Sequence, residues 1–288
     1  MRKIFFVLAI VFISAACTKH DPFDNLDGEA WILSLFAQDN YQNESGDTYF
    51  SYEDMKNSGL LSSPVKEGSR YYRVPTSGEL QMIFPECQDR EFLSQYNMYV
   101  PLNFVWAPVQ GSLTMQETAC LENKDDGSAD RSGEVISGES EFYYAEDYED
   151  DDPDFIPNFA LRFKGTSQYA AYMYQIKLVG EGNDRHYVLS LKAKWLKAAD
   201  VTTTIEDIIK PEYWVSGYLS LEIPFASYIR ADGTPDADIS GRLNSSTLRN
   251  GASVVGYFDI YSYAGLFTED SSCRCPLRLI RCHADGTL

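Results

Sequence analysis

Alternation of large apolar residues with other residues, at a period of two, is the feature that most constrains the fold of this 288-residue chain. In residues 159–164, Phe159, Leu161 and Phe163 alternate with smaller or polar residues such as Arg162. Successive side chains of a strand point to opposite faces of a sheet, so this pattern is typical of a half-buried strand. The same pattern is longest in the region that follows.

Residues 169–195 contain two such alternating runs, which flank a glycine-rich turn at 180–184. Glycine and asparagine accept the positive φ angles that tight hairpin turns require. We therefore expect one long antiparallel hairpin with an apolar face and a polar face. The apolar face is expected to carry Tyr172, Tyr174, Ile176, Leu178, Tyr187, Leu189, Leu191, Ala193 and Trp195.

Other segments are rich in the β-branched and aromatic residues that strands favour. The predicted strands are residues 31–36, 80–84, 99–106, 112–115, 214–225 and 254–263. Short helices are predicted at 51–58, at 89–96, and after a capping box of Thr203 and Glu206 that precedes Pro211. Because the chain lacks a βαβ rhythm, the predicted fold is mainly β, an antiparallel β-sandwich or a barrel-like structure with few short helices.

The N-terminal residues have the organisation of an export signal. Arg2 and Lys3 precede an unbroken apolar run, residues 4–13. A membrane-spanning helix needs ~20 apolar residues, so this run has instead the length of a signal-peptide core. Small residues follow, and Cys17 comes directly after them. A plain secretory signal with a chance cysteine is the alternative.

The segment Ser14-Ala15-Ala16-Cys17 resembles the lipobox of bacterial lipoproteins, with Ser14 in place of the usual leucine, a looseness common in lipoproteins of the Bacteroidetes type. The resemblance implies cleavage before Cys17 and acylation of its thiol. It also implies attachment to the bacterial cell envelope, in the outer membrane, facing either the periplasm or the cell surface. Two or more acyl chains hold a protein stably, since each buried CH₂ contributes ~0.8 kcal/mol.

The predicted organisation has three parts. Residues 1–16 are the signal peptide, residues 17–27 are a polar tether that contains Pro22, and residues 28–288 are a β-rich soluble domain. That domain is either one unit or two β-subdomains that meet near residues 139–154.

The charge of the chain excludes nucleic acids as partners. It has 24 basic and 43 acidic residues, a formal net charge of −19. Nucleic-acid-binding proteins need basic patches that displace phosphate counterions, and anionic membranes repel an acidic surface. We therefore expect membrane contact through acylated Cys17 alone. The tail at residues 274–283 is more basic, with Arg274, Arg278 and Arg281, for no reason evident in the sequence.

Residues 139–154 contain nine carboxylates and no basic residue. Clustered carboxylates can bind Ca²⁺, but the spacing does not match an EF-hand loop. We therefore expect a solvated acidic loop, with calcium binding as the alternative.

The cysteines beyond Cys17 are odd in number, so at least one thiol stays unpaired. Three of them lie near His283, but a Cys-x-Cys spacing is not that of a zinc ribbon or finger. We expect disulfides or inert thiols, and neither a metal nor a cofactor. The five cysteines are Cys87, Cys120, Cys273, Cys275 and Cys282.

Catalytic motifs are absent from the sequence, which has only three histidines and no nucleophile elbow, H-E-x-x-H, P-loop or G-x-G-x-x-G. We expect His186 to be an edge-strand residue and the protein not to be an enzyme. Aromatic residues make up 14% of the chain, and sugars stack on exposed aromatic rings. The candidate ligand-binding residues, for which packing in the core or in a hairpin is the favoured interpretation, are Trp106, Tyr143, Tyr144 and Trp214.

The predicted function is that of a cell-envelope lipoprotein with a non-catalytic binding or structural role, with a glycan or an envelope protein as partner. The chain resembles uncharacterised cell-envelope lipoproteins of the Bacteroidetes type, on residues 1–21 and its overall character. A fimbrial or adhesin-like subunit, which needs an open sheet edge, is one alternative. A glycoside hydrolase, which needs two carboxylates at a set separation, is another.

Overall fold

The computed structural model of the chain describes residues 31–85, 111–121, 134–144, 157–196, 202–226, 228–236, 240–259 and 264–288. These residues form a mainly β protein in which every paired strand runs antiparallel to its neighbour. The predicted fold class is confirmed. None of the sheets built from these residues closes into a barrel.

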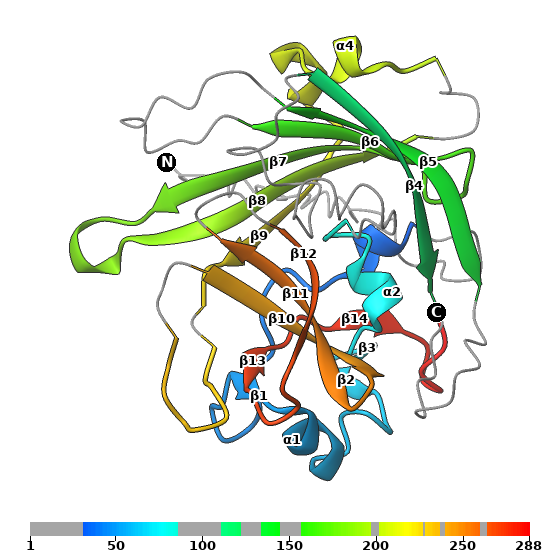
Figure 1. Cartoon of the computed structure of the whole chain (residues 1–288). Helices are drawn as coiled ribbons and strands as arrows, with labels where there is room; N and C mark the ends of the chain where they lie inside the picture. The colour runs from blue at the N-terminus through cyan, green and yellow to red at the C-terminus, as the bar shows by residue number, and fades with distance from the viewer. Residues whose placement is uncertain are drawn as a thin grey trace, which may run out of the picture.

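A six-stranded sheet forms the largest element and curves across the molecule (Figure 1). Strands that follow one another in sequence are neighbours in the sheet, so it is a meander. Its strands, in spatial order, are β4 (Gly111–Cys120), β5 (Val135–Tyr144), β6 (Asn158–Lys164), β7 (Ala170–Val179), β8 (His186–Trp195) and β9 (Leu219–Pro224).

Three smaller sheets complete the β structure. The first contains β10 (Ser240–Arg249), β11 (Ala252–Asp259) and β12 (Ala264–Glu269). The second has the order β14 (Ile280–Cys282), β3 (Arg70–Arg73) and β2 (Val65–Glu67), and the third pairs β1 (Tyr49–Phe50) with β13 (Cys275–Pro276). Strands from both ends of the described chain therefore pair with each other.

The helices are short, as predicted. The α-helices are α1 (Tyr52–Asn57), α2 (Ser77–Leu80) and α4 (Ile205–Ile208), and the 3₁₀ helices are η1 (Ile32–Leu35), η2 (Gly182–Asp184) and η4 (Pro211–Trp214). In the part of the chain that the structure describes, no helix has the length and apolar character needed to cross a membrane.

The predicted hairpin is confirmed as β7 and β8. The two strands pair over their whole length, with Tyr172 opposite Ala193 and Tyr174 opposite Leu191. Their apolar face packs into the main core, and Gly180 has a φ of 85° in the connecting turn. Alternation fixed the register here because a shift by one residue would turn the whole apolar face to solvent.

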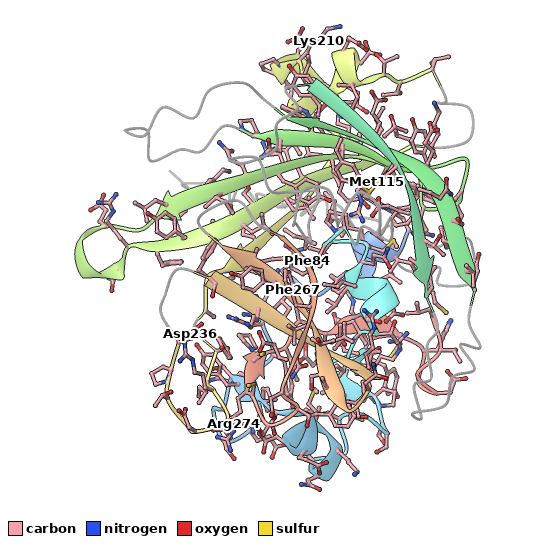
Figure 2. All side chains as sticks on the ribbon, in the orientation of Figure 1. Phe84, Met115, Lys210, Asp236, Phe267 and Arg274 are labelled. Carbon is pink, nitrogen blue, oxygen red and sulfur yellow. The ribbon has the colours of Figure 1, made fainter. Side chains whose placement is uncertain are left out.

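The inner face of the six-stranded sheet packs against α2 and the sheet of β10–β12 (Figure 1). Phe258 of β11 contacts Phe84 and Phe225, with ring centroids 5.8 Å and 4.8 Å apart. A Cβ atom on Gly256 would lie 2.3 Å from the ring of Phe84, which Figure 2 labels. Only glycine lets that ring lie against β11.

The outer face of the sheet is covered at one end by α4 and η4 (Figure 1). As a result β6 is buried on both faces, and the prediction that residues 159–164 form a half-buried strand is wrong. The residues of this outer cluster are Phe159, Leu161, Tyr169, Ala171, Met173, Leu196, Ile205, Ile208 and Trp214.

Arg162 of that strand lies fully buried in an ion pair with Glu117 of β4. Its Nε and Nη2 donate to the two carboxylate oxygens over 2.9 Å and 2.8 Å. The remaining N–H groups reach the carbonyls of Gln81 and Met82 and the hydroxyl of Tyr174. All five guanidinium donors are thus used, and the network joins three strands to the turn after α2.

Two predicted strands are wrong. Residues 31–36 contain η1, and residues 80–84 belong to the end of α2 and the turn that follows it. Thr76 and Glu79 form a reciprocal capping box, with Thr76 N donating to Glu79 Oε2 over 2.8 Å, and this starts a helix. Short apolar runs do not separate strand from helix by periodicity alone, so the capping box decides.

Other predicted elements are confirmed in whole or in part. The helix at 51–58 is α1, capped by Ser51, and residues 112–115 and 254–259 lie in β4 and β11. Residue 214 belongs to η4, so the strand predicted from there begins only at Leu219. The predicted elements at 99–106, 89–96 and 260–263 lie outside the described residues.

Two further corrections concern the helix α4 and the acidic segment. The capping box uses Thr204 and Asp207, one residue later than predicted. The acidic segment is not a loop throughout, because Glu139–Tyr144 lie in β5 and pair with both β4 and β6. Residues 145–154, the rest of the predicted acidic loop, lie outside the described residues.

Candidate functional site

A pocket of about 450 Å³ lies at the free edge of β9, the last strand of the six-stranded sheet. Four segments that are distant in sequence line it: residues 38–40, the β7–β8 hairpin, β9, and Arg278. Its polar lining residues besides Arg278 are Gln38, Asp39, Asn40, His186, Ser220 and Glu222. Val179, Val188 and Pro224 supply apolar surface.

Strand pairing positions the residues of β9. Phe225 N donates to Tyr187 O over 2.8 Å, so alternate residues of β9 turn their backbone groups toward β8. The backbone groups of Glu222 therefore point to the free edge. The side chains of Leu221 and Ile223 are buried in the core, and those of Ser220 and Glu222 are exposed on the pocket side.

Backbone contacts bring the N-terminal and C-terminal segments to this edge. Ala37 N donates to Leu279 O over 2.9 Å, and Tyr41 N donates to Leu277 O over 2.7 Å. These bonds hold residues 38–40 beside Arg278. The structure thereby gives a reason for the presence of Arg278, one of the basic residues of the tail at 274–283 that the sequence left unexplained.

Arg278 lines the pocket and is only 1% exposed. Its Nε donates to Asn40 Oδ1 over 3.2 Å, and its Nη2 donates to Glu222 O over 2.9 Å. Within the described residues its Nη1 has no hydrogen-bond partner. A buried donor without a partner costs about 1–3 kcal/mol, more when it is charged.

Burial lowers the pKa of Arg278 to about 10, and the nearby Asp39 carboxylate acts in the opposite direction without cancelling this effect. The charged guanidinium is thus less stable in the pocket than in water, because water is a better solvent for a cation. It still carries its charge at neutral pH. An acceptor or an anion placed at Nη1 would relieve part of this cost.

His186 lies exposed at the start of β8, where its Nδ1 is 2.9 Å from Asp184 O. The expectation that it belongs to an edge strand is wrong, because β8 has a neighbour on each side, β7 and β9. Because it lies directly after the turn that joins β7 to β8, it nevertheless lines the pocket.

The aromatic residues singled out in the sequence lie elsewhere. Trp214 is buried in the cluster under α4 and η4, where its Nε1 donates to Ile208 O over 2.6 Å, so it is a core residue, the role favoured for it, and not an exposed ligand-binding residue. Tyr143 packs half-buried against the same cluster. Tyr144 lies in β5, and Trp106 and Cys17 are outside the described residues. Packing of the outer face, which sequence does not reveal, accounts for Trp214.

The described cysteines are Cys120, Cys273, Cys275 and Cys282, and all four are free and buried. Burial raises the pKa of Cys275 to about 12. Among the described residues no three or more His, Cys, Asp or Glu side chains converge in a way that could hold a metal. Cys87 lies outside the described residues.

No motif or periodicity in the sequence marks the pocket. Its strongest signal was an arginine within an otherwise apolar run, Pro276-Leu277-Arg278-Leu279-Ile280. An arginine at such a position has to be buried or to interrupt the apolar surface. The partners Asn40 and Glu222 carry no sequence signal, because only the tertiary fold brings them to Arg278.

Comparison with known proteins gives a family but no activity. No curated protein and no solved structure matches this chain significantly. The model of a family described as a domain of unknown function, DUF8237, matches residues 25–280, which include every residue of the pocket. Because the match covers most of the sequence, the chain belongs to the DUF8237 family.

Proposed function

We propose that the protein is a lipid-anchored protein of the bacterial cell envelope that binds a glycan, without catalysis, in the pocket at the free edge of β9. The observation that carries the proposal is the set of polar side chains around Arg278, a buried cation with an unused donor. A pocket of about 450 Å³ lies within the usual size range of small-ligand sites.

The chemistry of the lining suits a sugar. Hydroxyl groups both donate and accept hydrogen bonds, and the pocket offers amide, carboxylate, imidazole and hydroxyl partners from Gln38, Asn40, Glu222, His186 and Ser220. Apolar surface from the valine and proline side chains suits the C–H faces of a sugar ring. The aromatic candidates of the sequence are not needed for this mode of binding.

The location rests on the N-terminal sequence. The loose lipobox Ser14-Ala15-Ala16-Cys17 favours cleavage before Cys17 and acylation of its thiol. The formal net charge of −19 disfavours direct contact with anionic lipids, so the acyl chains are the proposed membrane contact. We propose the outer membrane, and the orientation is either periplasmic or surface-facing.

A glycan array tests the binding proposal. The fluorescently labelled protein is applied beside two variants, Ser220→Trp, which fills the pocket, and Ser63→Trp, which adds the same side chain at an exposed serine after α1. We expect binding to a defined set of glycans by the wild type and by Ser63→Trp, and loss of at least about tenfold in Ser220→Trp. Equal binding by all three proteins, or binding by none, would contradict the proposal.

A glycoside hydrolase is the second candidate, because two carboxylates, Asp39 and Glu222, line the same pocket. Glycosidases use one carboxyl group as a general acid, which needs an apolar environment that retains its proton. Both side chains here are exposed, which favours binding over hydrolysis. Release of reducing ends from a bound glycan, lost in Asp39→Asn and in Glu222→Gln, would establish the hydrolase instead.

A further inference from the structure

The buried arginines of this protein differ in how they are neutralised. Arg162 donates to both oxygens of Glu117, Arg73 donates to both oxygens of Glu79, and Arg242 donates to Glu269 over 2.9 Å. Each of these buried or nearly buried cations therefore has a carboxylate partner within the fold. Such pairing is the rule for buried charges, because an unpaired one is costly.

Arg278 departs from that rule. Its two hydrogen bonds go to neutral oxygens, the amide of Asn40 and the carbonyl of Glu222, and its Nη1 is unpartnered in the described structure. Arg281 also has an Nη1 without a partner there, but it does not line the pocket. Among these buried arginines, all in the described part of the chain, Arg278 is the one that combines a charge without a hydrogen-bonded carboxylate with a place in a pocket wall.

We propose that Arg278 forms an anion subsite in the pocket and that the preferred ligand is an acidic sugar, whose carboxylate or sulfate group binds Nη1. This inference rests on the proposed function and names its substrate class. Asn40 and the backbone of Glu222 orient the guanidinium through its other two nitrogen atoms, and the buried Nη1 is the nitrogen left without a hydrogen-bond partner among the described residues. Hydrogen bonds between a guanidinium and an oxyanion are about twice as strong as neutral ones.

The carboxylate of Asp39 competes with a ligand anion for the charge of Arg278. Its carboxylate is close enough to Arg278 to act on its pKa, yet the side chain is exposed and makes no hydrogen bond to Arg278. A ligand anion that binds Arg278 is therefore repelled by the Asp39 carboxylate, unless that side chain moves away. Removal of the charge should therefore strengthen binding of acidic sugars, an effect opposite to that of structural damage.

The experiment compares sugars that differ in one group. Binding of D-glucose, D-glucuronate and D-glucose 6-sulfate to the full chain in detergent is measured by calorimetry at a single ionic strength. We expect D-glucuronate or the 6-sulfate to bind about ten- to a hundredfold more tightly than D-glucose. The stronger of the two identifies the natural anion as a carboxylate or a sulfate ester.

Two variants assign the effect to the subsite. Arg278→Gln should reduce binding of the acidic sugar to the level of D-glucose. Asp39→Asn should tighten binding of the acidic sugar about two- to fivefold relative to its effect on binding of D-glucose. Because Asp39 is exposed, this variant should fold normally even if Arg278→Gln does not.

The outcomes separate this inference from the proposed function. Equal binding of D-glucose and both acidic sugars would overturn the anion subsite and leave glycan binding intact. If no sugar binds but inorganic sulfate raises the melting temperature of the wild type and of Asp39→Asn, and not of Arg278→Gln, the subsite stands and glycan binding is wrong. No effect of any of these probes would overturn both.

Discussion

Replacement of Glu117 by glutamine tests the most deeply buried charge pair of the fold. The substitution keeps the size of the side chain but leaves the Arg162 cation fully buried without an anion. Removal of one partner from a buried ion pair costs about 3–5 kcal/mol. Whole domains are stable by about 5–15 kcal/mol, so Glu117→Gln should remove a large part of the unfolding free energy.

Arg162→Met should cost at least as much, because it leaves the Glu117 carboxylate unpaired and deprives two carbonyls, those of Gln81 and Met82, of their donor. The double variant removes both charges but still leaves these two carbonyls, at about 1–3 kcal/mol each. It should therefore be more stable than Arg162→Met alone and remain about 2–6 kcal/mol less stable than the wild type.

Urea unfolding followed by tryptophan fluorescence measures these differences. Glu53→Gln is the matched control, since Glu53 forms an exposed pair with Lys56 over 3.7 Å and should cost less than about 0.5 kcal/mol. The reasoning is refuted if Glu117→Gln falls within about 1 kcal/mol of the wild type, or if the double variant loses the sum of the two single losses.

Three further predictions concern the hairpin, the anchor and a buried thiol. Leu191→Ala, in the core face of β8, should lower the free energy of unfolding by about 2–5 kcal/mol in urea melts. Lys192→Ala should lower it by about 0.5–1 kcal/mol, because the Lys192 ammonium lies 4.7 Å from the centre of the Tyr218 ring. Equal losses would show that the two faces are equally packed. Cys17→Ala should abolish metabolic labelling with a clickable fatty acid, and persistent labelling would rule out the lipoprotein assignment. Cys275 should resist iodoacetamide at pH 8 in the native protein, because burial raises its pKa to about 12; mass spectrometry showing rapid alkylation at this residue would contradict its burial.

The hairpin of β7 and β8 could be predicted from sequence because the alternation rule holds on its inner face, whose large apolar residues meet one continuous core. The burial of Ala171 and Met173 on the other face, under α4 and η4, does not follow from that rule. The rule failed for β6, where α4 and η4 cover the outer face and bury Phe159 and Leu161 while Arg162 is buried on the inner side. Sequence does not show which later segment will cover a sheet.

The predictions of strands at residues 31–36 and 80–84 were wrong for a different reason. Both are short apolar runs, whose periodicity does not separate strand from helix, and in the second run the capping box of Thr76 and Glu79 outweighed strand propensity. A search for reciprocal capping pairs before every apolar run would have identified α2. It would not have identified η1, which has no side-chain cap.

The pocket could not be predicted because it is a product of tertiary structure alone. Residues 38–40 reach Arg278 through backbone bonds across most of the chain, and β9 contributes the carbonyl of Glu222 because it is the last strand of the sheet. Sequence showed only that Arg278 stands in an apolar run. Its unused donor, on which the proposed specificity depends, is visible only once its neighbours are placed.

The most direct test of the account is an NMR titration of the isotope-labelled protein with D-glucuronate, observed on backbone amides and on the Nε–H group of Arg278. We expect the largest shift changes at residues 38–40, at 186–188, at 220–222 and at Arg278, with saturation at a single dissociation constant. Shift changes concentrated around Tyr143 and Trp214, or spread without saturation over the surface, would show that the pocket at β9 is not the binding site.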